Sequence, residues 1–239
     1  MTAISAHRGG SETAPAETYD AYHAALESGA DYLEFDVRRI ADGTLVASHR
    51  ARFGRERDIS GLTYATLCDL AGHEVPKIAG LLRLLAGRAG AHVDLKEPEC
   101  ADAVVELALS LVGPADIVVT TRETAIVHAL KQRYPAVPAG LTMGGDLAER
   151  ARFALRRASD LQLSRLDDVA AAGADVAVIH HRLATTRLLA DCRRRGIQTM
   201  IWTVNNDRAL ARWLARPNVD VLVTDRPARA AERARVVRH

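Results

Sequence analysis

The residues of this sequence best suited to chemistry are carboxylates within short apolar runs. Glu34 and Asp36 lie two positions apart in one run, and Asp94 lies near the end of another. If the first run is a β-strand, Glu34 and Asp36 share one face, because successive side chains of a strand alternate. Two such carboxylates repel each other unless positive charge lies between them, and a third completes an all-oxygen ligand set. With no cysteine among them, this set favours Mg²⁺ or Ca²⁺ over zinc.

Further polar residues follow other apolar runs. His7 and Arg8 follow the first run, His49 follows a short run after a turn, and Trp202 ends a late run. Lys96 is two positions beyond the third carboxylate and shares its face in a strand. Each residue alone is more typical of a turn, a packed histidine or a surface ion pair. Their joint occurrence at successive strand ends indicates a single functional site.

The apolar runs alternate with segments that have apolar residues at helical spacing. The predicted strands are Ala3–Ala6, Tyr32–Val37, His92–Leu95, Asp116–Thr121, Ala136–Leu141, Asp175–Ile179, Gln198–Trp202 and Val219–Thr224. The predicted helices are Ala21–Ser28, Ala101–Leu111, Thr124–Arg133, Thr185–Arg195 and Asp207–Ala215. This alternation predicts a parallel sheet, because parallel strands need crossover connections. A closed (β/α)₈ TIM barrel suits this length better than an open doubly wound sheet, which remains the alternative.

One domain is expected to cover residues 1–239, since no linker or repeat interrupts the pattern. An extra strand, Leu45–Ser48, follows the turn dipeptide Asp42-Gly43 and should pair with the end of the second strand. The segment between His49 and the third strand is short, which leaves little room for a lid. Residues 226–239 form a basic C-terminal tail or helix in this interpretation.

The composition excludes several classes of protein. The chain has 239 residues, a net charge of +2, 48% hydrophobic residues and 26% charged residues, the balance of a soluble globular enzyme. Near-zero net charge argues against a nucleic-acid partner. Three scattered cysteines indicate reduced thiols and a cytoplasmic location. The absence of a long apolar run predicts no stable membrane association.

Short motifs occur in order along almost the whole chain. They are His7-Arg8-Gly9-Gly10, Pro15-Ala16-Glu17-Thr18, Gly29–Val37, Asp42-Gly43, His49, Ile59–Leu67, Val75-Pro76, Val93-Asp94-Leu95-Lys96, Trp202–Asn205 and Val223–Pro227. This ordered set resembles the glycerophosphodiester phosphodiesterase family, whose members fold as (β/α)₈ barrels.

The resemblance implies a catalytic machinery. His7 and His49 would be the general acid and base, and Glu34, Asp36 and Asp94 would bind the divalent cation, with Mn²⁺ a third candidate. Imidazoles, with an ordinary pKa of about 6.5, can divide the proton transfers of phosphodiester cleavage near neutral pH.

The resemblance also implies how a small-molecule phosphodiester would bind. Arg8 and Lys96 would contact the phosphodiester, and Trp202 would wall the pocket. The expected reaction is hydrolysis to glycerol 3-phosphate and an alcohol, which belongs to lipid and glycerol metabolism. Neither the alcohol nor the oligomeric state follows from the sequence.

The sequence departs from the family pattern at three positions. The family usually has Pro-Glu-Asn-Thr at residues 15–18, an aspartate in place of Arg50 and a glutamate in place of Asp94. The related sphingomyelinase D branch also carries an aspartate at this last position. Two alternatives therefore stay open: attack by a substrate hydroxyl to give a cyclic phosphate, and a non-catalytic barrel that binds a phosphorylated metabolite. Arg122, after the fourth strand, is a further candidate contact for a phosphate or headgroup, as are His180 and His181 after the sixth.

Overall fold

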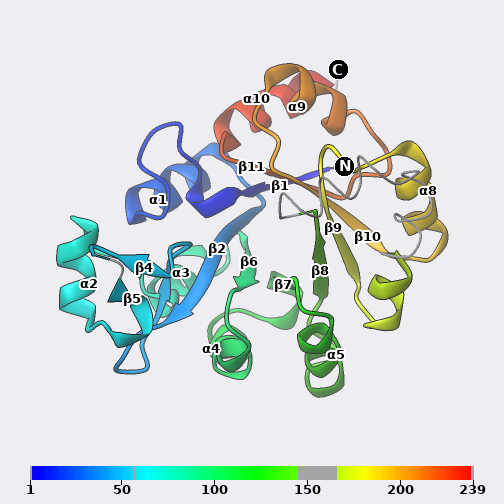
Figure 1. Cartoon of the computed structure of the whole chain (residues 1–239). Helices are drawn as coiled ribbons and strands as arrows, with labels where there is room; N and C mark the ends of the chain where they lie inside the picture. Colours follow the sequence, from blue (N-terminus) through cyan, green and yellow to red (C-terminus); the bar gives the residue numbers. More distant parts are fainter. Residues whose placement is uncertain (1, 56, 145–165, 238–239) are drawn as a thin grey trace.

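The computed structural model describes residues 2–55, 57–144 and 166–237. Parallel strands form a closed barrel, seen end-on in Figure 1. In barrel order they are β1 (Ala3–Ala6), β2 (Tyr32–Arg39), β6 (Gly90–Leu95), β7 (Ile117–Thr121), β8 (Ala139–Met143), β9 (Val176–His180), β10 (Gln198–Trp202) and β11 (Val221–Thr224). Pairing of β1 with both β11 and β2 closes the ring. The predicted (β/α)₈ barrel is confirmed, and the open doubly wound sheet is wrong.

Helices surround the barrel (Figure 1). They are α1 (Tyr19–Ser28), α2 (Tyr64–Ala71), α3 (Ile78–Leu85), α4 (Ala101–Leu111), α5 (Thr124–Arg133), α8 (Thr186–Arg194), α9 (Asp207–Leu214) and α10 (Pro227–Val237), with a further helix that ends at residue 171. Within the described ranges, none of these helices combines the length and the apolar composition needed to cross a bilayer.

Local sequence signals fix several helix ends. The Thr18 hydroxyl accepts a hydrogen bond from the Ala21 amide at the start of α1, and Asn206 caps α9 in the same way. Gly29 ends α1 in the left-handed conformation, with φ of 82°, as the sequence predicts. These caps set where each helix begins and ends, and therefore how each connection returns to the barrel.

Successive side chains of β2 point to opposite faces, so its apolar residues and its acidic residues lie on different faces. Leu33, Phe35 and Val37 are fully buried and pack in an apolar cluster that includes residues of α1, α3 and α4. Glu34 and Asp36 lie on the opposite face and line a cavity in the barrel mouth. The shared face predicted for Glu34 and Asp36 follows from this two-residue period.

A small lobe beside the barrel follows β2, and the sequence did not predict it. β3 (Leu45–Ala47) pairs antiparallel with β2 as expected, but β4 (Arg52–Phe53) and β5 (Arg57–Asp58) then form a second hairpin before α2. These elements enclose their own apolar cluster around Ile59 and Leu67 (Figure 1). The segment after His49, where the sequence left little room for a lid, thus carries this hairpin and helix. Of the described residues of this lobe, His49, in the loop between β3 and β4, lines the site cavity.

Candidate functional site

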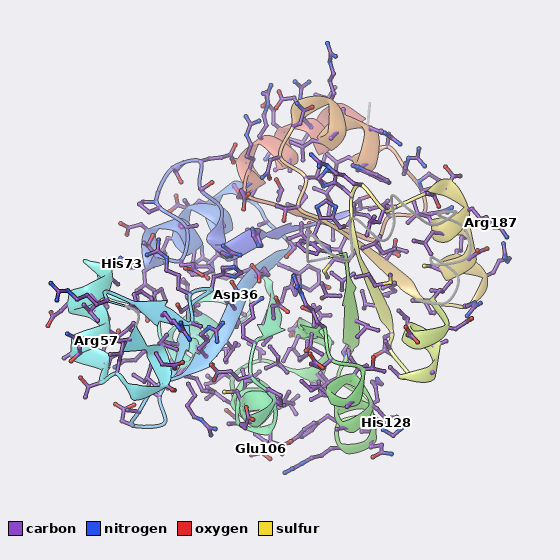
Figure 2. The ribbon with its side chains drawn as sticks, in the orientation of Figure 1. Asp36, Arg57, His73, Glu106, His128 and Arg187 are labelled. Atoms are coloured by element: carbon purple, nitrogen blue, oxygen red, sulfur yellow. The ribbon has the colours of Figure 1, made fainter. Side chains whose placement is uncertain are left out.

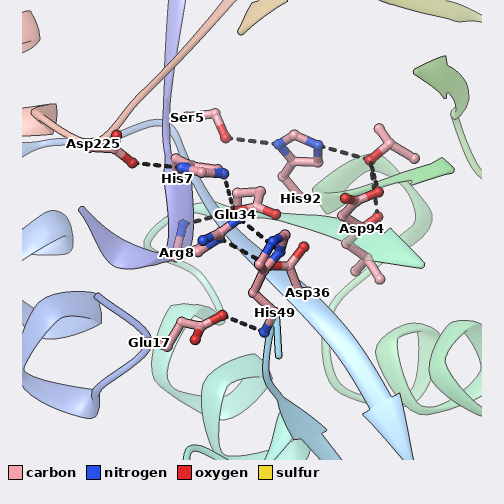
Figure 3. A network of polar contacts seen from close by, with 12 residues as sticks. Ser5, His7, Arg8, Glu17, Glu34, Asp36, His49, His92, Asp94 and Asp225 are labelled. Atoms are coloured by element: carbon pink, nitrogen blue, oxygen red, sulfur yellow. Dashed lines mark hydrogen bonds and ion pairs between the residues drawn. The ribbon is translucent and has the colours of Figure 1, made fainter. Parts of the chain in front are cut away.

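All eight side chains that the sequence placed in the site line one cavity at the carboxyl ends of the barrel strands. The cavity is lined by His7, Arg8, Glu34, Asp36, His49, His92, Asp94, Lys96, Thr120, Arg122, Thr142, Val178, Trp202 and Val223. Figure 3 shows the polar side chains from β1, β2, β6 and the loop after β3 turned toward one another. Residues up to 216 positions apart along the chain, His7 and Val223, thus share one small volume.

The three carboxylates come close enough together to share a cation. One oxygen from each of Glu34, Asp36 and Asp94 lies within 4.8 Å of the other two. Glu34 and Asp36 are almost completely buried, with 3% and 2% of each residue exposed. Carboxylate oxygens are the ligands that hard divalent cations prefer, so this donor set fits Mg²⁺, Ca²⁺ or Mn²⁺.

The turn after β1 needs an unusual backbone. Arg8, Gly9 and Gly10 all have positive φ, at 52°, 77° and 85°. A Cβ atom on Gly9 would lie 2.9 Å from the Tyr22 amide nitrogen of α1, so only glycine fits there. This turn directs the Arg8 amide at a Glu34 carboxylate oxygen, 2.7 Å away. The strained conformation therefore connects the first strand to the acids of the second.

Two cations lie against the carboxylates. The Lys96 ammonium is 2.7 Å from one oxygen of Asp36 and 2.5 Å from one of Asp94. The Arg8 guanidinium is 3.0 Å from the other oxygen of Asp36. Asp36 is therefore held between two positive charges, whereas Glu34 has no lysine or arginine side chain in ion-pair contact within the described residues and only His7 at 4.0 Å.

This asymmetry separates the pKa values of neighbouring acids. Burial, reinforced by the charge of Asp36, raises the pKa of Glu34 to about 8. Burial would also raise the pKa of Asp36, but the hydrogen bond from His49 and the charges of Lys96 and Arg8 outweigh it and hold that pKa well below its usual range. Burial raises the pKa of Asp94. In the metal-free site, Asp36 is thus ionised at neutral pH, whereas Glu34 holds its proton more tightly than an ordinary glutamate.

The raised pKa of Glu34 predicts that the metal-free protein loses stability as pH rises from about 5 toward 8. An unfolded glutamate has a pKa of about 4.3. Between that value and the folded pKa of about 8, folded Glu34 keeps a proton that the unfolded chain has released, so rising pH favours unfolding. Glu34→Gln removes this titration and should flatten the profile. Thermal unfolding in EDTA across this pH range measures both proteins, and parallel profiles would contradict the assignment.

The two predicted catalytic histidines flank the acids in different environments. His7 Nε2 is 4.0 Å from a Glu34 oxygen, and the ring is mostly buried. His49 Nδ1 is 2.9 Å from an Asp36 oxygen and 2.8 Å from the Arg8 guanidinium, and 48% of its side chain is exposed. Both rings border the cavity (Figure 3).

Sequence reasoning missed two carboxylates that hold these histidines in place. An Asp225 oxygen is 2.6 Å from His7 Nδ1, and its other oxygen accepts a hydrogen bond from the Asn205 amide. A Glu17 oxygen accepts a hydrogen bond from the His49 backbone amide at 2.5 Å. Glu17 adopts a φ of 65°, rare for a non-glycine residue. The motifs around residues 15–18 and 223–227 were recognised, but these contacts depend on the closed barrel.

Asp225 is expected to set the pH at which His7 titrates. Burial disfavours protonated His7, but the charge of Glu34 and the hydrogen bond to Asp225 outweigh burial and raise the pKa of His7. Asp225→Asn removes the charge, so the pKa of His7 should fall and its limb of the pH profile of kcat/KM should move to lower pH. NMR titration of the His7 ring checks this directly. If Asp225→Asn lowers kcat but the His7 limb of the pH profile stays at the same pH, Asp225 only orients the His7 ring.

A buried polar chain lies behind the third carboxylate. The Ser5 hydroxyl is 2.9 Å from His92 Nδ1, His92 Nε2 is 3.1 Å from the Thr120 hydroxyl, and Thr120 lies 3.2 Å from an Asp94 oxygen. Burial lowers the pKa of His92 to about 3, so its ring is neutral and can donate on one side while accepting on the other. The chain fixes one Asp94 oxygen while Lys96 holds the other.

Trp202, His180 at the end of β9 and His181 directly after it form one aromatic cluster. The ring centroid of Trp202 is 5.3 Å from that of His180, edge to face, and His180 stacks on His181 with centroids 4.5 Å apart. Trp202 borders the cavity beside Val178 and Val223, whereas His180 and His181 do not line it. Trp202, Val178 and Val223 make this side of the cavity apolar.

Known proteins match this chain in sequence and in fold along almost its whole length. The model of the glycerophosphoryl diester phosphodiesterase family matches residues 7–81 and 87–229. Glycerophosphodiester phosphodiesterase GDPD4 of Arabidopsis thaliana is 26% identical over 94% of this chain and 71% of its own length. A glycerophosphodiester phosphodiesterase structure from Agrobacterium tumefaciens superposes with a TM-score of 0.73 at 26% identity, covering 97% of this chain and 100% of that one. An Oleispira antarctica phosphodiesterase in complex with sn-glycerol-3-phosphate gives 0.78 at 19% identity, covering 98% and 96%. With the family model matching most of its length, this chain belongs to the glycerophosphoryl diester phosphodiesterase family of enzymes.

Proposed function

We propose that this protein hydrolyses glycerophosphodiesters to glycerol 3-phosphate and an alcohol in a cation-dependent reaction. The observation that carries the proposal is the convergence of three carboxylates, two imidazoles and two cationic side chains on one cavity. Glycerol 3-phosphate is also the ligand of the Oleispira antarctica enzyme.

Glu34, Asp36 and Asp94 would hold the cation. Bound there, a divalent cation supplies positive charge that offsets the negative charge gathering on the phosphoryl oxygens. Asp36 is ready to bind at neutral pH because Lys96 and Arg8 already keep it ionised. Glu34 would release its proton on binding, since the donor that a cation needs is the carboxylate. Mg²⁺, Ca²⁺ and Mn²⁺ are the candidates.

His7 and His49 would move the protons. A phosphodiester is a stable anion, so the attacking water must lose a proton and the departing alkoxide must gain one. His7 is oriented by Asp225 through Nδ1, which leaves Nε2 facing the Glu34 side of the cavity. His49 is oriented through Nδ1 by Asp36 and through its backbone by Glu17. Each ring therefore has a second nitrogen available for proton transfer.

Arg8 and Lys96 would bind the phosphoryl oxygens. Both side chains already lie beside the acids that would hold the cation. They can therefore neutralise negative charge on a phosphoryl group bound there. Trp202, with Val178 and Val223, would pack against the carbon chain of the glycerol unit. With this reaction the protein would act in lipid and glycerol metabolism, and the free cysteines favour the cytoplasm for it.

Purified protein assayed for glycerol 3-phosphate release from glycerophosphoethanolamine tests the proposal. Activity should appear with Mg²⁺, Ca²⁺ or Mn²⁺ and vanish in EDTA. Phosphorus NMR of the products separates hydrolysis from attack by a substrate hydroxyl, because a cyclic phosphate has its own resonance. If calorimetry shows that a diester binds but no turnover occurs with Mg²⁺, Ca²⁺ or Mn²⁺, the result would instead support a non-catalytic barrel.

A further inference from the structure

A second cavity adjoins the site on the side of β6 and β7. Arg38, Leu95, Thr121, Arg122, Glu123 and Ile126 line it, together with His49, Asp94 and Lys96, which also line the first cavity. Arg122 borders both cavities as well. A bound diester could therefore extend past His49 from one cavity into the other.

Two of the basic side chains that line the second cavity form ion pairs within the protein, and a third does not. Lys96 is paired with Asp36 and Asp94, and the Arg38 guanidinium is 2.9 Å from a Glu97 oxygen. Arg122 is exposed and has no side-chain hydrogen bond or ion pair with any residue in the described part of the chain. A guanidinium in this position, at the junction of two cavities, is available to a ligand.

We propose that the second cavity takes the alcohol arm of the substrate and that Arg122 binds an anionic group on it. The inference rests on the proposed hydrolysis of glycerophosphodiesters. With the phosphoryl group beside the three carboxylates and the glycerol unit against Trp202, the other ester oxygen faces the second cavity past His49. A planar guanidinium binds a carboxylate or a phosphate through two parallel hydrogen bonds.

The remaining lining residues favour the same class of headgroup. Among the described residues that line the second cavity there is no phenylalanine, tyrosine or tryptophan, so it lacks the ring faces that hold a quaternary ammonium group such as that of choline. Glu123 lines it beside Arg122 and has no side-chain partner among the described residues. A headgroup with a carboxylate next to an ammonium group, as in serine, would use both free charges.

Two matched substrate pairs test the proposal. Glycerophosphoserine differs from glycerophosphoethanolamine by one carboxylate, and glycerophosphoinositol 4-phosphate differs from glycerophosphoinositol by one phosphate. The expected result is a kcat/KM about 10-fold or more higher for the anionic member of one pair, the size of a charge-assisted hydrogen-bonded contact. The pair that shows it identifies the anion as carboxylate or phosphate.

Arg122→Gln should bring that preference to about 2-fold or less, and Arg122→Lys should keep part of it. Arg187→Gln removes the same charge from the outer surface of α8, away from Asp36 (Figure 2), and should leave the preference unchanged. A preference that survives Arg122→Gln, or no preference in either pair while the diesters without the extra anionic group are hydrolysed, overturns the inference alone. Failure to hydrolyse any of the four diesters overturns the proposed function, and the inference with it.

Discussion

His7→Ala is expected to lower kcat by about 10²–10⁴-fold, the contribution of a well-placed general acid or base. His7 is mostly buried between Glu34 and Asp225, so no exposed residue can substitute for its ring. The fold should persist, because His7 lies in the barrel mouth and outside the apolar clusters of the barrel and its helices. Steady-state kinetics with saturating cation measures the loss, and circular dichroism checks the fold.

His128→Ala is the matched control for this experiment. His128 is exposed on α5, on the periphery of the molecule, whereas Asp36 lies near its centre (Figure 2). The control should retain wild-type kcat. If His7→Ala, correctly folded, turned over substrate within about threefold of wild type, His7 would not be a proton-transfer group and the proposed division of labour would be lost.

Asp36→Asn is expected to abolish measurable cation binding and to lower kcat/KM on the order of 10³-fold, equivalent to about 4 kcal/mol of transition-state stabilisation. Asp36 is the acid that stays ionised in the metal-free site, and it also holds Arg8, His49 and Lys96. One substitution therefore removes a cation ligand and an anchor for three groups. Calorimetric titration with Mn²⁺ measures the binding, and the diester assay measures the rate.

Asp102→Asn provides the comparison for Asp36→Asn. Asp102 lies on α4, half-exposed, in an ion pair with Arg133 on α5. Exposed ion pairs contribute at most about 1 kcal/mol to stability, so this variant should bind the cation and turn over substrate normally. Undiminished Mn²⁺ affinity in Asp36→Asn would show that the three carboxylates are not the cation site.

The sequence predicted the barrel because its strands are short, apolar and evenly separated by amphipathic segments. Strand ends agree within about three residues; Pro138 precedes β8 without an amide hydrogen, so this strand starts at Ala139 and not at Ala136. α3, Ile78–Leu85, is not among the helices predicted from the sequence, although its buried residues Ile78, Leu81, Leu82 and Leu85 have helical spacing. α2 and its hairpin are stabilised by a cluster whose members are far apart in sequence, including Ile40 and Val75.

The sequence by itself determined which residue types reach the barrel mouth, since strand alternation fixes the faces of Glu34, Asp36 and Asp94. Only the tertiary structure decided what each of those side chains does. The raised pKa of Glu34 depends first on burial in the closed barrel. The ionisation of Asp36 and the support of His7 by Asp225 depend on which charges the closed barrel brings within 4 Å. Electrostatic interactions act through space and depend on burial, so residues distant along the chain set them, and no local pattern in the sequence records that distance.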